Sequence, residues 1–257
     1  MSAIVAIPAR LQSTRFPRKV LADIHGKPML WYVYQGVSQA KRISAVWVLT
    51  DSDEVYQEAI SWGAKALMTP EDCPSGTDRI ASVIGQLDAD IVVNVQGDEP
   101  LMDGAVVDTM IVSLEASNAD VVTPVYRIND AADITNVNIN KVVRATDNTA
   151  LYFSHSPIPH VRGKAIEDWP SLANFWGHVG VYGYRRSVLE EYGQLPEGRL
   201  ESVEKLEQLR LLEAGKKILT VEIDYHPMGV DVPSDLERVK ELIDPHTHLR
   251  RENAPSV

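Results

Sequence analysis

The sequence has almost no cysteine: Cys73 is the only one in a chain of 257 residues. A single thiol forms no internal disulfide and excludes a zinc site built from several cysteines. Long apolar runs are also missing, because no segment reaches 18 apolar residues, so we expect no membrane span. The five small or apolar residues before Pro8 are too few for a signal peptide. These absences predict a soluble protein of the cytoplasmic type.

Basic side chains are scarce relative to acidic ones. The chain has 25 Lys and Arg against 36 Asp and Glu, which gives a net charge of −11 at pH 7. Nucleic acids and anionic membranes attract basic surfaces, so neither is predicted as a partner. A hydrophobic content of 44% with 24% charged residues is ordinary for a folded globular protein and excludes a disordered chain.

Short apolar runs alternate with longer amphipathic segments over the first 120 residues. This alternation predicts βαβ units and an α/β fold with a mostly parallel central sheet flanked by helices. We expect one domain over residues 1–243 and a flexible tail over 244–257. The predicted strands are 3–7, 46–49, 65–68, 91–95, 120–127, 140–145, 150–153, 179–184 and 218–223. The predicted helices are 27–40, 53–62, 77–87, one from Ser187, 201–214 and 234–243, the last with Ser234 as its N-cap.

The loop after the first predicted strand, Pro8–Lys19, is basic. The first 22 residues contain four basic side chains and no acidic one. Ligands of open α/β sheets bind beyond the carboxyl ends of the strands, which is where this loop lies. Arg and Lys beside the hydroxyls of Ser13 and Thr14 are suited to a polyphosphate, although a solvated basic loop is the alternative. The sequence lacks a Walker motif and a Gly-x-Gly-x-x-Gly fingerprint, so neither a P-loop enzyme nor a Rossmann dehydrogenase is supported.

Two carboxylates follow predicted strand ends. Asp98 comes after the most apolar strand, and Asp231 stands between a short apolar stretch and a helix. Mg²⁺ takes one or two carboxylates together with substrate oxygens, so the pair predicts a magnesium site. Each residue could instead cap a helix or close a turn.

The turn Ser75–Arg79 leads into a predicted helix. Unpaired N–H groups at a helix N-terminus can hold a base, a ribose or a phosphate. A plain N-cap by Ser75 or Thr77 is the commoner explanation for such residues.

Eight stretches in order resemble the 3-deoxy-manno-octulosonate (Kdo) cytidylyltransferases, also called CMP-Kdo synthetases. Any one of them is weak, but together they span nearly the whole chain. They are Ile7–Arg15, Gly26–Met29, Ser75–Arg79, Asn94–Pro100, Ala150–Ser154, His178–Tyr184, Leu206–Arg210 and Gly229–Asp231.

The resemblance implies a nucleotidyltransferase fold with a smaller α+β subdomain that forms a dimer face. It implies transfer of CMP from CTP to the anomeric hydroxyl of Kdo, with release of pyrophosphate and Mg²⁺ as cofactor, for lipopolysaccharide assembly. Catalysis would involve Lys19, Arg10 and Asp98. The residues matching the nucleotide site are Arg10, Ser13, Arg15, Lys19, Ser75, Gly76, Thr77, Arg79 and Gln96. The metal ligands would be Asp98 and Asp231. The sugar-acid side would be His178, Tyr182 and Gln208 as donors and Glu207 as an acceptor.

The chain departs from the family pattern in three stretches. Arg18 and Val20 stand where glycine and proline are usual, His155 where arginine is usual, and Gly198 and Arg199 where serine and proline are usual. The last two leave open a close Kdo analogue such as the 8-amino sugar. A related cytidylyltransferase for a sialic-like acid and a non-catalytic nucleotide-sugar binding protein are the alternatives. The latter would be expected to lose Lys19, Asp98 or Asp231.

Overall fold

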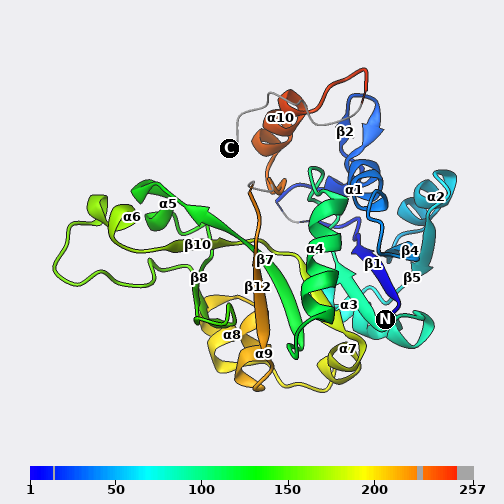
Figure 1. Ribbon diagram of the computed structural model, residues 1–257. Coiled ribbons are helices and arrows are strands. Elements are labelled where there is room, and N and C mark those ends of the chain that lie inside the picture. Colours follow the sequence, from blue (N-terminus) through cyan, green and yellow to red (C-terminus); the bar gives the residue numbers. More distant parts are fainter. Residues whose placement is uncertain (14, 225–227, 248–257) are drawn as a thin grey trace. The chain divides into compact units, whose positions relative to one another are not determined.

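The computed structural model describes residues 1–13, 15–224 and 228–247, and these divide into two compact units (Figure 1). The first unit comprises the described parts of Met1–Ile111, Gly183–Gly193 and Tyr225–Val257. The second comprises Val112–Tyr182 and Gln194–Asp224. Each unit is described separately below.

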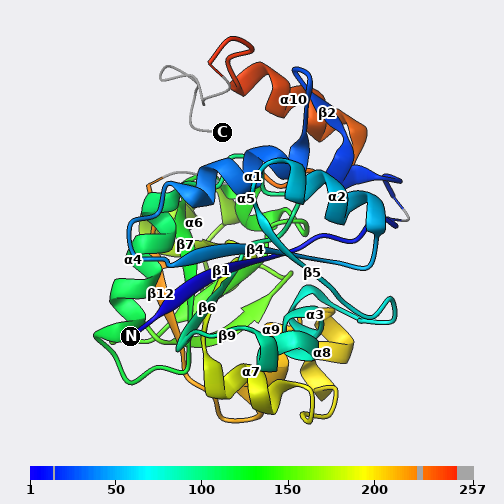
Figure 2. The same cartoon turned by 90° about the vertical axis from the view of Figure 1, so that its right-hand side faces the viewer.

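The first unit is built on a parallel sheet. Its strands run in the order β5 (Lys65–Met68), β4 (Ala45–Thr50), β1 (Ala3–Pro8) and β6 (Ile91–Asn94). Every residue of β1 and β6 is buried, as expected for strands covered on both faces. Helices α1 and α2 lie on one side of these strands and α3 on the other (Figure 2). The expected parallel sheet flanked by helices is therefore confirmed.

The remaining elements of this unit include a short hairpin and β11 (Tyr182–Arg185), whose first residue is counted with the second unit. The hairpin strands are β2 (Asp23–Ile24) and β3 (Lys27–Pro28). The helices are α1 (Met29–Ser38), α2 (Asp53–Ser61), α3 (Gly76–Val83), α7 (Arg186–Tyr192) and α10 (Pro233–Leu242). Two 3-10 helices cover Lys19–Leu21 and Ile84–Gln86. Helix α4 (Gly104–Glu115), which the sequence analysis did not assign, begins here and runs into the second unit.

The second unit is built on a mainly antiparallel sheet. Its order is β7 (Val121–Ile128), β10 (Phe175–His178), β8 (Lys141–Arg144) and β9 (Ala150–Ser154). Strand β12 (Ile218–Glu222) pairs with β7 in parallel. The helices are α5 (Ala131–Thr135), α6 (Trp169–Leu172), α8 (Arg199–Glu204), α9 (Gln208–Glu213) and the 3-10 turn Ile166–Asp168.

The single helix predicted over residues 201–214 is wrong, because the chain forms α8 and α9 with a break between them. Lys205 adopts a left-handed conformation with φ of 56°, which ends α8. Arg210 of α9 then reaches back to Glu201 of α8, with Nη2 and Oε1 2.6 Å apart. A tertiary ion pair thus joins the two short helices.

Two further predictions need correction. The strand predicted over 179–184 is divided, since β10 ends at His178 and β11 begins at Tyr182. The N-cap of α10 is Val232 and not Ser234. The carboxylate of Asp235 accepts hydrogen bonds from the backbone N–H groups of Asp231 and Val232, at 3.0 and 3.1 Å.

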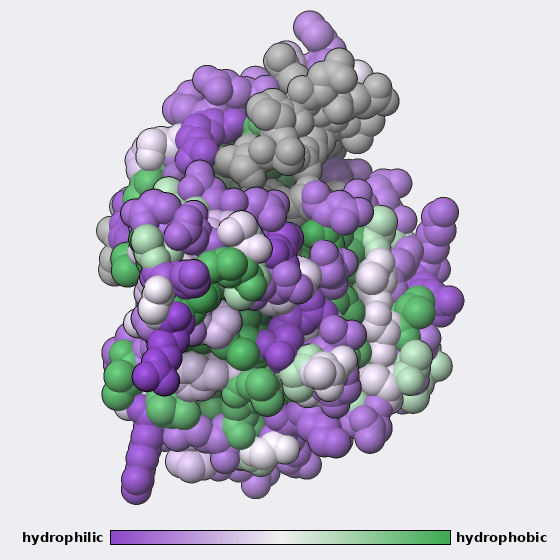
Figure 3. Space-filling view, turned by 60° about the vertical axis from the view of Figure 1, so that its left-hand side comes forward, coloured by the Kyte–Doolittle hydropathy of each residue, from purple (hydrophilic) through white to green (hydrophobic). Residues whose placement is uncertain are grey.

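The surface mixes hydrophilic and apolar side chains, as Figure 3 shows for one face. Exposed large apolar residues such as Val137, Leu151 and Val203 occur along the second unit. Within the described residues, we find no helix both long and apolar enough to span a bilayer. Most of the predicted tail, residues 248–257, lies outside the described residues.

Candidate active site

A polar pocket in the first unit gathers most of the predicted site residues. The basic loop after β1, the turn before α3 and the segment after β6 line it, together with Asp231. All the residues predicted for the nucleotide and the metal take part except Thr77. Arg10 is exposed in this pocket, so its guanidinium is accessible to an anion. The carboxyl ends of β1 and β6 therefore meet at one site, as expected for neighbouring parallel strands.

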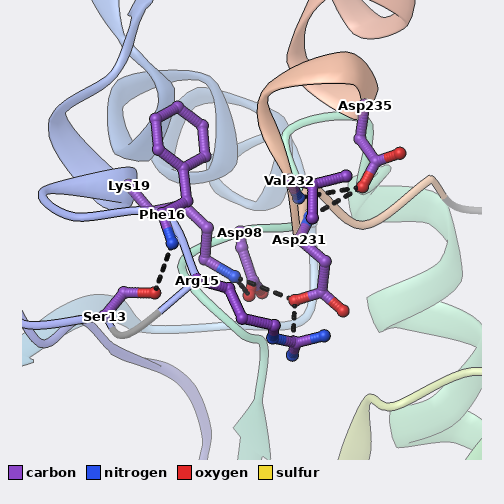
Figure 4. A network of polar contacts seen from close by, with 8 residues as sticks. All are labelled: Ser13, Arg15, Phe16, Lys19, Asp98, Asp231, Val232 and Asp235. Atoms are coloured by element: carbon purple, nitrogen blue, oxygen red, sulfur yellow. Dashed lines mark hydrogen bonds and ion pairs between the residues drawn. The ribbon is translucent and has the colours of Figure 1, made fainter.

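Lys19 lies at the centre of an ion-pair network (Figure 4). Its side chain is only 12% exposed, and its Nζ lies 2.5 Å from Asp98 Oδ2 and 3.2 Å from Asp231 Oδ1. Arg15 also donates to Asp231 Oδ1, at 3.1 Å. Asp235 holds the backbone of Asp231 in place, so the second carboxylate is oriented by the first turn of α10. One cationic amine thus brings two carboxylates from distant segments together.

The carboxylate pair fits a divalent cation. Oxygens of Asp98 and Asp231 already contact one common amine, and Mg²⁺ commonly takes one or two carboxylates plus substrate oxygens. Burial, together with the adjacent Asp98 carboxylate, raises the pKa of Glu99 to about 8. An ionised Glu99 would add a third negative charge beside Asp98 and Asp231, and this is disfavoured unless a further cation is present. The described residues contain no cluster of three or more His, Cys, Asp or Glu side chains arranged for a metal.

Gln96 lies beneath the turn that precedes α3. A Cβ at Gly76 would come within 2.9 Å of Gln96 Nε2, so a larger residue there would require the Gln96 side chain to shift. Gln96 Nε2 donates to Asn94 Oδ1 at 3.0 Å, and Asn94 Nδ2 donates to Thr77 Oγ1 at 3.3 Å. Thr77 is fully buried and also contacts the hydroxyl of Tyr184 at 3.2 Å. Thr77 therefore holds Gln96 in place through Asn94 and does not itself line the pocket.

Ser75 acts as the N-cap of α3, which is the commoner of the two explanations for this turn. Its Oγ accepts a hydrogen bond from the backbone N–H of Asp78 at 3.1 Å. Ser75 nevertheless lines the pocket beside Gly76. The turn thus both begins the helix and forms one wall of the site.

Arg79 lines the same pocket, but its guanidinium is bonded to the protein. The residue is 3% exposed, and its Nη2 lies 2.7 Å from Asp51 Oδ2. It also donates to Thr69 Oγ1 and to the carbonyl of Pro70. Its observed contacts therefore fasten the ends of β4 and β5 to α3.

The variant Arg79→Met is expected to lower the free energy of unfolding by about 3–5 kcal/mol, because Asp51 would be left largely buried without its partner. Chemical denaturation measures this change. Arg18→Met is the matched control, since its pair with Glu54 is exposed and should contribute little to stability. Equal losses in the two variants would contradict the structural role of Arg79.

The predicted sugar-acid residues lie in the second unit. His178, 9% exposed, ends β10 and packs edge-on against Phe153, with ring centroids 4.9 Å apart. Tyr182 begins β11 with its ring centroid 5.4 Å from that of His178. Gln208 and Glu207 stand at the start of α9, and Gln208 Nε2 is buried with no hydrogen-bond partner among the described residues.

Thr123 fixes the protonation of the His178 ring. The Thr123 hydroxyl lies 2.8 Å from the carbonyl of Val181 and 3.1 Å from that of Val179, so its one proton points to these carbonyl acceptors. The contact of 3.0 Å between Thr123 Oγ1 and His178 Nε2 must therefore have the imidazole as donor. Nδ1 then carries a lone pair and is an acceptor, whereas the sequence analysis expected His178 to provide a donor.

His178 is expected to make the protein less stable in mild acid. Burial lowers the pKa of His178 to about 3, whereas an unfolded histidine titrates near 6.5. As the pH falls through 6.5, the unfolded chain takes up a proton and the folded chain does not. The contribution to the free energy of unfolding should therefore fall by about 1.4 kcal/mol between pH 7.5 and 5.5. Denaturation at both pH values tests this, and His178→Gln should have a correspondingly smaller pH dependence. An identical pH dependence in the two proteins would contradict the assignment.

The sequence analysis did not identify some of the residues that lie at the site. Asn94 and Glu99 flank the predicted Gln96 and Asp98, but nothing in their spacing indicated a buried relay or a protonated carboxyl. Thr123 carried a signal, since it is the one hydroxyl residue in the otherwise apolar stretch Val121–Val125. A single polar residue in a buried strand needs a partner, and here that partner is His178.

Known proteins with similar sequences match most of this chain. The family described as "Cytidylyltransferase" matches residues 4–218. The 3-deoxy-manno-octulosonate cytidylyltransferase of Geobacter sulfurreducens is 43% identical over 253 residues, covering 95% of this chain and all of that protein. Its counterpart in Escherichia coli is 43% identical over 241 residues, covering 94% of this chain and 96% of that protein.

Solved structures of known proteins are also similar to this chain. A CMP:2-keto-3-deoxy-manno-octonic acid synthetase complexed with CTP superposes with a TM-score of 0.89 at 43% identity, covering 94% of this chain and 98% of that one. A putative glucose-1-phosphate thymidylyltransferase from Bacillus anthracis shares the fold alone, with a TM-score of 0.66 at 13% identity, covering 94% of this chain and 95% of that one.

The fold is that of a nucleotidyltransferase, and the chain belongs to the cytidylyltransferase family. Within that family it belongs with the 3-deoxy-manno-octulosonate cytidylyltransferases, and it is an enzyme.

Proposed function

We propose that the enzyme transfers CMP from CTP to the anomeric hydroxyl of Kdo, or of a close analogue such as the 8-amino sugar, and releases pyrophosphate. The observation that carries this proposal is the pocket in which Lys19, Asp98 and Asp231 meet beside Gln96 and the turn before α3. The names of the relatives and the CTP complex of the similar structure support the choice of nucleotide and sugar.

In the proposed reaction, the anomeric oxygen forms a bond to the α-phosphorus of CTP as the bond between that phosphorus and the β-phosphate oxygen breaks. Arg10, Arg15 and Lys19 would bind the triphosphate and neutralise the charge that develops on the departing pyrophosphate. No residue of the protein needs to act as a nucleophile, because the sugar hydroxyl attacks directly.

Asp98 and Asp231 are the proposed ligands of Mg²⁺. When bound, the ion would supply positive charge to the reacting phosphates. Lys19 would then exchange its contact with Asp98 for contacts with the phosphates. Gln96, held by Asn94 and Thr77, and the turn around Gly76 would border the cytidine.

On the sugar-acid side, His178 would accept a hydrogen bond at Nδ1 and Gln208 would donate one from Nε2. Tyr182 and Glu207 would complete this set. By the same resemblance we propose a homodimer formed through the second unit, and lipopolysaccharide assembly as the use of the product.

Pyrophosphate release tests the proposal. The protein is incubated with Mg²⁺ and each of the four NTPs, together with Kdo, its 8-amino analogue or a sialic acid. Release is expected only with CTP and only when Kdo or its analogue is present. Release that needs a sialic acid, or that needs no sugar, would overturn the proposal.

A further inference from the structure

We infer that Asn140 is a specificity-determining residue that accepts a hydrogen bond from a hydroxyl of the sugar acid, next to His178. This inference rests on the proposed function, because it assigns one more contact to the same substrate. None of the motifs that carry the resemblance includes Asn140.

The pairing of β10 with β8 places the two residues opposite each other. Trp176 pairs with Val142 and Gly177 with Lys141, so the next pair in this antiparallel register is His178 with Asn140. The backbone N–H of His178 indeed donates to the carbonyl of Asn140 at 2.8 Å. Side chains directly opposite in an antiparallel pair stand on the same face of the sheet. Asn140 and His178 are therefore neighbours on one face.

Both side chains carry a buried polar atom without a hydrogen-bond partner among the described residues: Nδ1 of His178 and Oδ1 of Asn140. Nδ1 is an acceptor because Nε2 carries the ring proton that binds Thr123. Oδ1 is an acceptor by its chemistry. Buried polar atoms are nearly always paired in folded proteins, so two adjacent unpaired acceptors indicate a ligand or solvent that brings donors.

The backbone on either side of Asn140 is firmly held. The side chain of Lys141 is fully buried, and its Nζ donates to the carbonyls of Asn136, Ile139 and His155 at 2.8, 2.6 and 2.6 Å. These bonds tie the segment before β8 to the end of β9. Asn140 therefore occupies a fixed position, as a residue that selects a substrate requires.

The chemistry of the two acceptors identifies the group that they bind. A carboxylate would face two lone pairs and be repelled, so the acid group of the sugar must bind elsewhere. A hydroxyl or an amino group can donate to either acceptor. We therefore assign this face to a hydroxyl-bearing part of the sugar acid, or to the amino group of an amino analogue.

The test combines variants of Asn140 with sugars that lack single donors. Asn140→Leu removes the amide at similar volume, and Asn140→Ala is a smaller change that serves if the leucine variant does not fold. Asn138→Leu is the matched control, because Asn138 is exposed two residues earlier. Thermal unfolding establishes that each variant is folded. The kcat/KM for Kdo, for its monodeoxy analogues and for the 8-amino sugar is then measured with saturating CTP and Mg²⁺.

Loss of a contact to a substrate hydroxyl should lower kcat/KM for Kdo tenfold or more in the Asn140 variants and leave the KM for CTP within about twofold. With one of the deoxy analogues, the wild type and the Asn140 variant should have the same kcat/KM, because that analogue lacks the hydroxyl that Asn140 binds. The control should behave as wild type. A folded Asn140 variant that is equally impaired with every sugar, or unimpaired with Kdo, would overturn the inference. Failure of wild type to use any of these sugars would instead overturn the proposed function.

Discussion

Replacing either Asp98 or Asp231 with alanine is expected to abolish turnover while the protein stays folded. Asp98 and Asp231 are partly exposed at the pocket, so removing either costs little packing. Each supplies one of the two carboxylates that we propose for Mg²⁺, and the remaining one would hold the ion poorly. Steady-state turnover at saturating Mg²⁺, with circular dichroism to confirm the fold, measures the effect.

A second readout separates metal binding from nucleotide binding. Lys19 is paired with Asp98 and Asp231, so the removal of Asp98 takes away one of the two groups that hold the amine. CTP binding measured in EDTA should therefore be retained or tightened in Asp98→Ala. Asp72→Ala, an exposed carboxylate on the loop before the pocket turn, is the control and should keep full turnover. More than a tenth of wild-type turnover in either Asp98→Ala or Asp231→Ala would refute the metal assignment.

The variant Lys19→Ala should lower kcat by roughly 10²–10³-fold, the loss found when one preorganised donor to a transition state is removed. Lys19 is 12% exposed and its amine lies in the pocket between two carboxylates, so its charge is already positioned near the proposed phosphates. Lys19→Arg should recover part of the rate, because it restores the charge with a different shape. Steady-state kinetics with CTP and Kdo gives both values.

The adjacent Arg18 is the matched control for Lys19. Its guanidinium forms a two-pronged pair with Glu54, and the two side chains are 58% and 47% exposed, so the pair adds little stability. Arg18 also adopts a left-handed φ of 60°, a conformation that glycine takes without strain. Arg18→Gly should therefore keep the rate of the wild type. If Arg18→Gly lost as much rate as Lys19→Ala, the assignment of the phosphate contact in this loop to Lys19, and not to Arg18, would be wrong.

The core of the first unit could be predicted from the sequence because local pattern and burial agree there. Strands β1 and β6 are uninterrupted apolar runs, and both are fully buried. The break at Lys205 could not be predicted, since the helical spacing of leucines continues through it. The pair between Glu201 and Arg210 joins residues nine apart in the folded chain, and the leucine spacing gives no sign of it.

The candidate site also combines features that could be predicted from the sequence with features that could not. Strand ends and the basic loop predicted which residues would gather in the pocket, because the carboxyl ends of parallel strands share one edge. The roles of Arg79 and His178 could not be predicted in this way. The resemblance places Arg79 near the cytidine, and only the structure shows that its guanidinium is paired with Asp51. The proton on His178 depends on Thr123, which is 55 residues away in the sequence.

The central claim is that the enzyme joins CMP to a 3-deoxy sugar acid by direct attack of its anomeric hydroxyl on CTP. ³¹P nuclear magnetic resonance of one reaction with CTP, Kdo and Mg²⁺ tests it most directly. The account predicts that the triphosphate signals are replaced by one phosphodiester and one pyrophosphate for each CTP consumed. Formation of free CMP as the initial product, or a spectrum that stays that of CTP, would contradict it.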